Sequence, residues 1–584
     1  MQQPLSTPAR PRDASDLAGS PPLSGKAAQR AGSAAVTRPG RRVRSGSGAF
    51  KLLAMVLSCL GASCTRATPQ DATATQAAAS VPSPGAASPA AGDRPPPDLT
   101  RVMSAPELEA ASNPVGLVRK TAAATPGYTL VAPLNSRRVH LVDLDGAVVH
   151  TWETGFAPGG WCYLLGDGTL LYCGRIDEEP QFRGGGIGGA LRRFAPDGSV
   201  VWRYDLADAS RWQHHDVAPM PNGNVLVLAW VRQTRAEAIA RGRDPRGVGE
   251  VGLWPDSVFE IRPTLPAGGA IVWEWHAWDH LVQEVDPTKP NHGRRADHPG
   301  RIDVNAAFEP PETLSDEDRA KIDDRLRQMA AIGYGGNDAQ DPPPDARKKE
   351  KPRGKDWSKT GDWLHTNAID YHAELDLIVL SSPELSEVFV IDHSTTSEEA
   401  RGSTGGRYGK GGDLLWRWGD PAMHGAGGDA ERRLFHQHDP TWIDGPAGEL
   451  RLLVFNNGGE RPGGDFSSVD ELVLPFDREH GFRHEPGRPF GPAEPVWTYA
   501  RRGEFFSGFI SGARRLASGN TLVTSGAAGR IFEVTPAGEI VWEYVNPHGG
   551  DVTPPEHAGR APRTALFRAD RYAPDHPGVA KLVR

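Results

Sequence analysis

Two features that would narrow the class of this chain are scarce or absent. Cysteine is rare, with four residues in 584, so a metal site rich in thiolates is not indicated. The formal net charge is −8 and no basic stripe stands out, which argues against a nucleic-acid-binding protein. Glycine, proline and tryptophan are instead abundant, at 68, 52 and 16 residues. This composition is typical of a turn-rich all-β protein.

The first 64 residues resemble an export leader. A basic stretch at 37–51 precedes the apolar run LLAMVLSCLGASC (52–64), which is too short to span a bilayer but fits the core of a signal peptide. The run ends in small residues and Cys64, which resembles a bacterial lipoprotein processing site where the cysteine is lipidated. Processing at Cys59, a plain secretory signal and a spurious upstream start codon are the alternatives. We therefore expect an exported protein, periplasmic or membrane-anchored as a lipoprotein, with residues 1–64 as its leader.

Residues 65–100 are rich in Ala, Pro, Ser and Thr and hold almost no large apolar side chain. Such a segment cannot bury a core, so we expect a disordered linker. Two cysteines lie further on, Cys162 and Cys173, on either side of LLGDGTLL. A hairpin that turns at Asp167 and Gly168 would set them opposite each other, and an exported protein could oxidise them. The alternative is that both are apolar strand residues.

One motif recurs along the chain: small turn residues with glycine, then aliphatic residues, then tryptophan. It reads APDGSVVW at 195–202 and PAGEIVW at 536–542. Each copy closes a unit of about four short strands, and Asp-Gly, Asn-Gly and Ala-Gly steps supply the positive φ of tight turns. We expect the tryptophans to pack between neighbouring units rather than to bind a ligand. The closing tryptophans are Trp152, Trp202, Trp273, Trp416, Trp497 and Trp542.

Units of this kind cannot bury their faces singly but can when they are arranged radially. The sequence therefore predicts an all-β fold, a six-bladed β-propeller of four-stranded antiparallel blades over 101–584. A strand near 115–131 should complete the last blade, and one insertion, 277–362, should contain a helix at 315–333. The expected blades are 128–155, 160–206, 213–276, 363–420, 436–500 and 506–546.

Polar residues gather where the innermost strands of three successive blades begin. The stretches are WQHHDVAPM (212–220), WLHTNAIDY (363–371) and FHQHDPTWI (435–443). Because equivalent positions of a propeller converge on its central channel, we expect a functional cluster of imidazoles there. Histidine can serve as nucleophile, as general acid or base, or as metal ligand. The cluster comprises His214, His215, Asp216, His365, Asn367, His436, His438 and Asp439.

The two aspartates of this cluster follow histidines directly. We expect Asp216 and Asp439 to accept hydrogen bonds from backbone amides at the start of their strands. The alternative is that they orient imidazoles.

The run DWLHTNAIDYHAELDLIVLSSPELSEVFVIDHSTT (362–396), with QHD (437–439) and NNG (456–458) after it, resembles the bacterial arylsulfotransferase family. The resemblance covers most of 128–546 and implies the same six-bladed propeller. It also implies transfer of a sulfuryl group from a phenolic sulfate ester to a phenol, with no nucleotide sulfate donor and no other cofactor. A channel histidine is transiently sulfated in this chemistry.

The resemblance also implies roles for the histidines, carried over by their position in these motifs. His438 matches the nucleophile. His365 and Asn367 match the pair that holds the sulfuryl oxygens, and His365 can also act as an acid. The HHD stretch supplies a further catalytic histidine, His214 or His215. His436 joins Asn367 among the expected substrate-binding residues.

One position departs from the family pattern. Pro383, with Glu384 beside it, stands where family members with this chemistry carry an arginine. Arg432, Arg433 or Arg461 would have to replace it.

Two other functions use the same residues. One is a non-catalytic ligand-binding or scaffold propeller without the arginine, and the other is a metal-dependent envelope enzyme. For the first-named reaction the expected partners are a phenolic sulfate donor, a phenol acceptor and a membrane reached through the lipid anchor, with no nucleic acid and no metal.

Overall fold

The structure is a computed structural model that describes residues 114–176, 182–308, 315–331, 360–446, 448–550, 552 and 564–583. The chain divides into two units, Met1–Arg94 and Pro95–Arg584, and every described residue belongs to the second. The predicted leader, the linker, Cys59 and Cys64 therefore lie outside the described residues.

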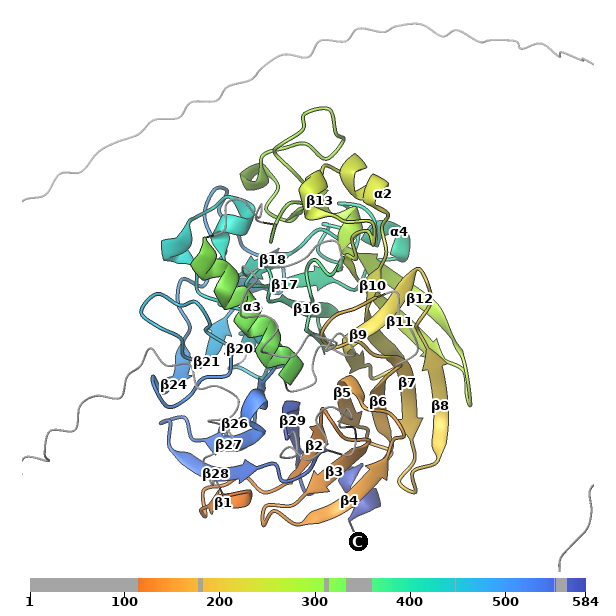
Figure 1. Cartoon of the computed structure of the whole chain (residues 1–584), viewed down its shortest axis with the longest axis vertical. Coiled ribbons are helices and arrows are strands. Elements are labelled where there is room, and N and C mark those ends of the chain that lie inside the picture. The colour runs from red at the N-terminus through yellow and green to blue at the C-terminus, as the bar shows by residue number, and fades with distance from the viewer. Residues whose placement is uncertain are drawn as a thin grey trace, which may run out of the picture. The chain divides into compact units, whose positions relative to one another are not determined.

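Antiparallel sheets dominate the second unit and follow one another around a common centre (Figure 1). One sheet has the order β29 (Leu566–Tyr572), β2 (Tyr128–Pro133), β3 (Arg138–Val142), β4 (Val148–Glu153). The next has the order β12 (Gly269–His276), β11 (Asp256–Pro263), β10 (Val225–Val231), β9 (Arg211–Pro219), β5 (Pro158–Leu164), β6 (Leu170–Arg175), β7 (Gly189–Phe194), β8 (Val200–Asp205).

The other large sheets follow the same plan. One has the order β15 (Ala368–His372), β16 (Leu377–Ser382), β17 (Glu387–Asp392), β18 (Trp416–Trp418). Another has the order β19 (His438–Ile443), β20 (Arg451–Asn456), β21 (Ser468–Val473), β24 (Trp497–Ala500). The last has the order β1 (Gly116–Lys120), β28 (Ile540–Val545), β27 (Arg530–Val534), β26 (Thr521–Ser525), β25 (Gly512–Arg515).

The eight-stranded sheet is two four-stranded halves. Their innermost strands β5 and β9 are joined by a parallel pairing, where Gly160 faces His215. The described residues form five sheets of four or more strands. Six units result when the eight-stranded sheet is divided into its two halves. Their innermost strands contact one another in a closed cycle, which runs β29, β5, β9, β15, β19, β25 and back to β29. The predicted all-β propeller is confirmed, and the count of six depends on this division.

The tryptophans of the repeated motif tie each unit to the next. Each lies on an outer strand and donates its indole N–H to a loop of the following unit, and the last returns to the first. A hydrogen bond of this kind contributes about 1 kcal/mol, in addition to the burial of the ring. The bonds are Trp152 to Ala195 O, Trp202 to Gly268 O, Trp273 to Thr395 Oγ1, Trp416 to Gly491 O, Trp497 to Pro536 O and Trp542 to Leu144 O, at 2.7–3.2 Å. The predicted structural role of these residues holds.

Two strands from the ends of the described chain close the ring. β1 pairs with β28 and adds a fifth strand to the last unit, as the sequence predicted for this region. β29 pairs with β2 and supplies the innermost strand of the first unit. The sequence analysis missed β29, whose charged residues Arg568, Asp570 and Arg571 hide its strand character.

Helices and small strand pairs lie between the sheets. Two short pairs are β13 (Leu281–Val282) with β14 (Ile302–Asp303), and β22 (Phe476–Asp477) with β23 (Gly481–Phe482). The α-helices are α2 (Arg235–Ala240), α3 (Asp316–Ala331), α4 (Ser397–Ala400) and α5 (Val579–Leu582). Among the described residues, no helix is long and apolar enough to cross a membrane.

The predicted insertion helix is α3, which runs across the face of the sheets in Figure 1. Ser315 caps its first turn as predicted, because its Oγ accepts the Asp318 backbone N–H at 3.0 Å. Met329 packs against the apolar cluster that contains Ile510 and Phe567. This contact places the helix beside the histidine cluster described below.

Of the two alternatives for Cys162 and Cys173, the structure has apolar strand residues rather than a disulfide. Cys162 and Cys173 are both free and buried. Gly166, Asp167 and Gly168 make a three-residue turn, so the register differs by one from that of a two-residue hairpin. Cys162 therefore faces Tyr172, and the two sulfurs point into different apolar clusters.

Candidate active site

Non-glycine residues with positive φ gather where the innermost strands begin. His215, His365 and His436 have φ of 54°, 53° and 57°. Asp439 and Ile510 follow with 56° and 49°. This region costs a non-glycine residue about 1–3 kcal/mol and persists only where the surroundings enforce it, which is common at active sites. The strain lies at the strand starts where the sequence predicted the polar cluster.

His438, at the start of β19, is held as a neutral imidazole with a defined tautomer. Its Nδ1–H donates to Asn457 Oδ1 at 2.7 Å, and the Ile510 backbone N–H donates to its Nε2 at 3.2 Å. Burial lowers the pKa of His438 to about 3, although the bond to Asn457 acts in the opposite direction. Nε2 therefore carries the lone pair of a neutral ring, the form that a nucleophilic histidine needs.

Asp256, His214 and His215 form a buried chain. Nε2 of His214 lies 3.2 Å from Asp256 Oδ1, and Nδ1 of His214 lies 2.8 Å from Nδ1 of His215. The contact of His214 with Asp256 lacks hydrogen-bond geometry, so it does not fix which of the two Nδ1 atoms donates to the other. Burial lowers the pKa of His215 well below 6.5, and the charge of His365 adds to this. His214 stacks on the ring of Trp230, and its contact with His215 holds the His215 ring in place.

His365 pairs with a carboxylate that the sequence analysis did not single out. Its Nδ1 is in hydrogen-bond contact with Asp362 Oδ2, and Asp362 Oδ1 accepts the Trp230 indole N–H at 3.1 Å. The carboxylate fixes Nδ1–H as the donor and leaves Nε2 to exchange a proton with a substrate. The His365 side chain is 12 % exposed, against 0 % for His214.

Two of the predicted histidines lie near one aromatic ring, and a third meets one of these two. His215 and His365 meet edge to face with ring centroids 4.5 Å apart. The ring of Phe567, on β29, lies 6.1 Å from that of His215 and 6.4 Å from that of His438. The charge of His365 also lowers the pKa of His438, which places the two within electrostatic range. The structure thus brings His215, His365 and His438 together.

Asn367 is buried beside this group. Its Nδ2 donates to the backbone carbonyl of Gln437, the residue that precedes His438, at 2.9 Å. Its Oδ1 has no hydrogen-bond partner among the described residues. Asn367 therefore braces the start of β19 and has one amide hydrogen and one oxygen left for a substrate.

His436 lies apart from the other three histidines. Its Nδ1 donates to the backbone carbonyl of Pro383 at 3.2 Å, and its Nε2 lies 3.5 Å from Glu460 Oε2. Burial lowers its pKa, and the charge of Arg325 on α3 adds to this. Arg325 also lies 3.6 Å from Glu384. His436 is therefore placed beside α3 rather than among the channel imidazoles.

The three arginines named as replacements at the Pro383 position all have protein partners. The pairs are Arg432 with Ser386, Arg433 with Glu494 and Arg461 with Ser468, at 2.7, 3.0 and 2.6 Å.

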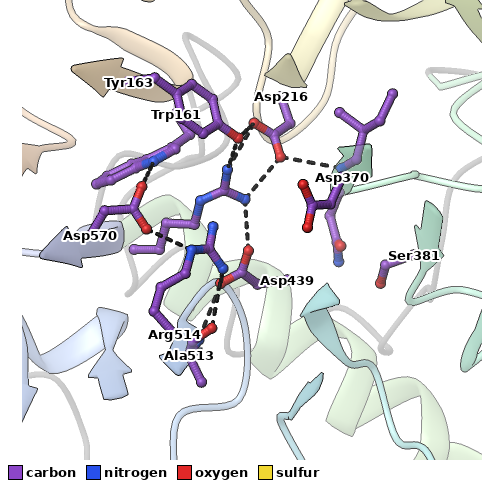
Figure 2. A network of polar contacts seen from close by, with 12 residues as sticks. Trp161, Tyr163, Asp216, Asp370, Ser381, Asp439, Ala513, Arg514 and Asp570 are labelled. Carbon is purple, nitrogen blue, oxygen red and sulfur yellow. Dashed lines mark hydrogen bonds and ion pairs between the residues drawn. The ribbon is translucent and has the colours of Figure 1, made fainter. Parts of the chain in front are cut away.

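A buried network of carboxylates and guanidinium groups adjoins the histidines (Figure 2). Asp216 accepts the Val217 backbone N–H of its own strand at 2.9 Å, as the sequence predicted, whereas Asp439 accepts that of Ala513 on β25 at 3.1 Å. Both carboxylates also bind Arg568, which the sequence analysis missed. Asp362, Asn457 and Phe567 were not singled out either, although Asp362 begins the stretch 362–396 and Asn457 lies in NNG (456–458), both of which carry the family resemblance. Asp362 could have been identified from the sequence, because it directly precedes the stretch that begins at Trp363.

No group of three His, Cys, Asp or Glu side chains within the described ranges is arranged to hold a metal ion.

A family model for arylsulfotransferase (ASST) matches residues 164–550. This chain belongs to the arylsulfotransferase family. The match spans all three strand starts that carry the histidines, and also Asp362 and Asn457. No curated protein matches the sequence.

Solved structures resemble this arylsulfotransferase family member only remotely. A protein of unknown function from Bacteroides caccae has a TM-score of 0.36 at 10 % identity and covers 76 % of this chain and 99 % of its own. The periplasmic gluconolactonase PpgL of Pseudomonas aeruginosa has 0.30 at 12 %, with 71 % and 94 % covered. An inactive virginiamycin B lyase from Staphylococcus aureus has 0.29 at 8 %, with 74 % and 88 % covered. Likeness at these values bears on neither the fold nor the activity of this chain.

Proposed function

We propose that the protein transfers a sulfuryl group from a phenolic sulfate ester to a phenol through a sulfohistidine at His438. In the first half, the Nε2 lone pair of His438 attacks sulfur and the S–O bond to the aryl group breaks. The departing aryl oxide takes a proton from Nε2 of His365. The products are the free phenol and His438 bearing the SO3 group.

The second half runs the same steps in reverse with another phenol. Nε2 of His365, now deprotonated, accepts the proton of the acceptor hydroxyl. The phenol oxygen attacks sulfur, the S–N bond to His438 breaks, and the ring returns to its neutral form. Atoms and charge balance without a cofactor. The sulfuryl group moves to His438 and then to the acceptor, and the proton that His365 gives to the first phenol is replaced by the proton of the second.

The environment of His438 carries this proposal. Asn457 holds Nδ1–H, so that the lone pair is on Nε2, and a pKa of about 3 keeps the ring neutral at any physiological pH. The His365–Asp362 pair places a proton-transfer group on the neighbouring strand. The unpaired polar atoms of Asn367 are available to sulfuryl oxygens or to the phenol. A nucleophile, an acid–base pair and a polar anchor thus meet at one place.

The test is turnover of p-nitrophenyl sulfate with phenol as acceptor. His438→Ala should lower the rate by about 10³-fold or more, because no other group can carry the sulfuryl intermediate. Mass spectrometry of the enzyme after donor alone should find one SO3 group on the peptide that contains His438. His372→Ala is the control, since this half-buried histidine lies at the far end of β15. Full activity in His438→Ala would refute the mechanism.

We also propose that the chain is exported and anchored through a lipid on Cys64. The leader-like segment 52–64 of the sequence supports this. Expression with a labelled fatty acid should label the wild type and leave Cys64→Ser unlabelled, with Cys59→Ser as the matched control. Label on Cys64→Ser and none on Cys59→Ser would move the processing site to Cys59.

A further inference from the structure

One guanidinium group lies at the junction of several innermost strands. Arg568, on β29, is 1 % exposed and binds Asp216 with both terminal nitrogens, at 2.8 and 3.0 Å. The same Nη1 reaches Asp439 Oδ1 at 2.9 Å, and Nη2 donates to Tyr163 Oη at 2.6 Å. A planar fork can make this set of contacts, whereas an ammonium group has no such geometry.

The two carboxylates that Arg568 holds directly follow two of the channel histidines in the sequence. Asp216 comes after His215 on β9, and Asp439 comes after His438 on β19. His215 and Asp439 also have positive φ, so the backbone at both places depends on its surroundings for its conformation. A movement of either carboxylate therefore moves an imidazole.

Further contacts extend the network to the remaining innermost strands. Asp216 Oδ2 accepts the Ile369 backbone N–H of β15 at 3.2 Å. Asp439 Oδ2 accepts from Arg514 of β25 at 2.5 Å, and Arg514 Nε lies 2.6 Å from Asp570. Figure 2 shows these groups pointing toward one another from separate strands. All six innermost strands meet in this network.

We infer that Arg568 is a positioning residue, which fixes the separation of His215 and His438 by holding Asp216 and Asp439 together. The inference rests on the proposed sulfuryl transfer, in which His438 attacks sulfur and is later displaced from it, beside His215 and His365. Phe567, the neighbour of Arg568, lies within reach of both rings and is delivered by the same strand. Arg568 itself is not expected to contact the substrate, because its side-chain hydrogen bonds are to Asp216, Asp439 and the Tyr163 hydroxyl.

The chain offers a matched control on the same strand. Arg571 is as buried as Arg568 and forms an ion pair with the buried Glu533. It lies against Trp542 of β28, on the other side of the strand. Replacing it breaks a comparable buried ion pair without touching a histidine-bearing strand.

The experiment compares Arg568→Lys and Arg568→Met with Arg571→Lys and Arg571→Met. We expect all four to lower Tm. The Arg568 variants should also lose about 10- to 100-fold in kcat at similar KM, because a displacement near 1 Å at the reacting groups has effects of this size. The Arg571 variants should keep kcat at 25 °C. Tyr163→Phe removes the hydroxyl's bonds to Arg568 and to Asp216 but leaves both carboxylates bound to Arg568, and it should also keep kcat.

A second readout does not depend on turnover. Reaction of each histidine with diethylpyrocarbonate, mapped by peptide mass spectrometry, should rise at His215 and His438 in Arg568→Lys relative to the exposed His480. It should stay unchanged in Arg571→Lys. Equal kcat and equal labelling in the Arg568 and Arg571 variants would overturn the inference. If the wild type transfers no sulfuryl group, the proposed function fails, while labelling still decides whether Arg568 positions the two histidines.

Discussion

At the scale of single residues, the site divides its chemistry between two kinds of histidine environment. His438 has an amide oxygen on Nδ1 and a pKa of about 3, so it stays neutral and can attack. His365 has a carboxylate on Nδ1, which stabilises the protonated ring that forms when a proton is taken up. In the proposed mechanism, the difference between Asn457 and Asp362 is what separates the nucleophile from the acid–base group.

This assignment predicts a dependence on the leaving group. His365→Gln should lower kcat by about 10²- to 10⁴-fold for phenyl sulfate, whose phenolate needs a proton. The loss should be much smaller for p-nitrophenyl sulfate, because p-nitrophenolate departs without one. Asp362→Asn should follow the same pattern more weakly, since it leaves the ring in place but removes its orienting charge. The measurement is kcat for a series of substituted phenyl sulfates with a constant acceptor.

Equal losses across that series would assign His365 to binding rather than to proton transfer. His372→Gln provides the matched control, because it changes a half-buried histidine at the far end of β15, the strand that follows His365, outside the cluster.

Residue types at repeated strand starts allowed much of the site to be predicted. Three blades that begin with histidine implied convergence, and His215, His365 and His438 do converge. The partners that set their chemistry could not be found in this way. Asn457 lies on the chain after β20, and Arg568 comes from the last strand, so neither has a local pattern that links it to a histidine. Long-range pairing of this kind is a property of the folded chain.

At the scale of elements, repetition explains which strands were predictable. The tryptophan motif closes every unit, and its indole N–H always bonds to the following unit, so six copies define six outer strands. β29 has no such copy and was missed, although it completes the first unit. The expected pairing in the hairpin at Asp167 was wrong for a different reason. One additional turn residue changes which side chains face each other.

Ring closure makes the two ends of the described chain part of the site. β1 and β29 pair with strands about four hundred residues away in the sequence, and β29 carries Phe567 and Arg568 into the centre. The helix α3 approaches the same region from the insertion, where Arg325 meets Glu384. The histidines of the candidate site and the elements that enclose them thus come from segments spread over the entire propeller.

At the scale of the whole molecule, buried histidines make stability depend on pH in both directions. On the alkaline side the decisive group is His393, which lies 2.6 Å from Asp376 and 3.3 Å from Glu260. Burial acts to lower its pKa, but the two carboxylates outweigh this and raise it to about 9. Because the folded pKa exceeds the unfolded value near 6.5, its contribution is fully present below pH 6.5 and is lost as pH rises through 9.

On the acid side the channel histidines act in the opposite sense. Burial lowers the pKa of His438 to about 3 and that of His215 well below 6.5, so the unfolded chain takes up protons that the folded chain refuses. Their contribution is present above pH 6.5 and is lost as pH falls toward 3. Buried Asp370 opposes this in part, because burial raises its pKa to about 6.

The free energy of unfolding should therefore pass through a maximum near pH 6.5–7, measured by urea denaturation from pH 5 to 9.5. His393→Gln should remove up to about 3 kcal/mol at pH 6.5 and flatten the alkaline limb, since a pKa unit corresponds to about 1.4 kcal/mol. His480→Gln, an exposed histidine, is the control and should leave both limbs unchanged. An alkaline limb of equal slope in His393→Gln and wild type would show that the ion pairs of His393 do not link proton binding to folding.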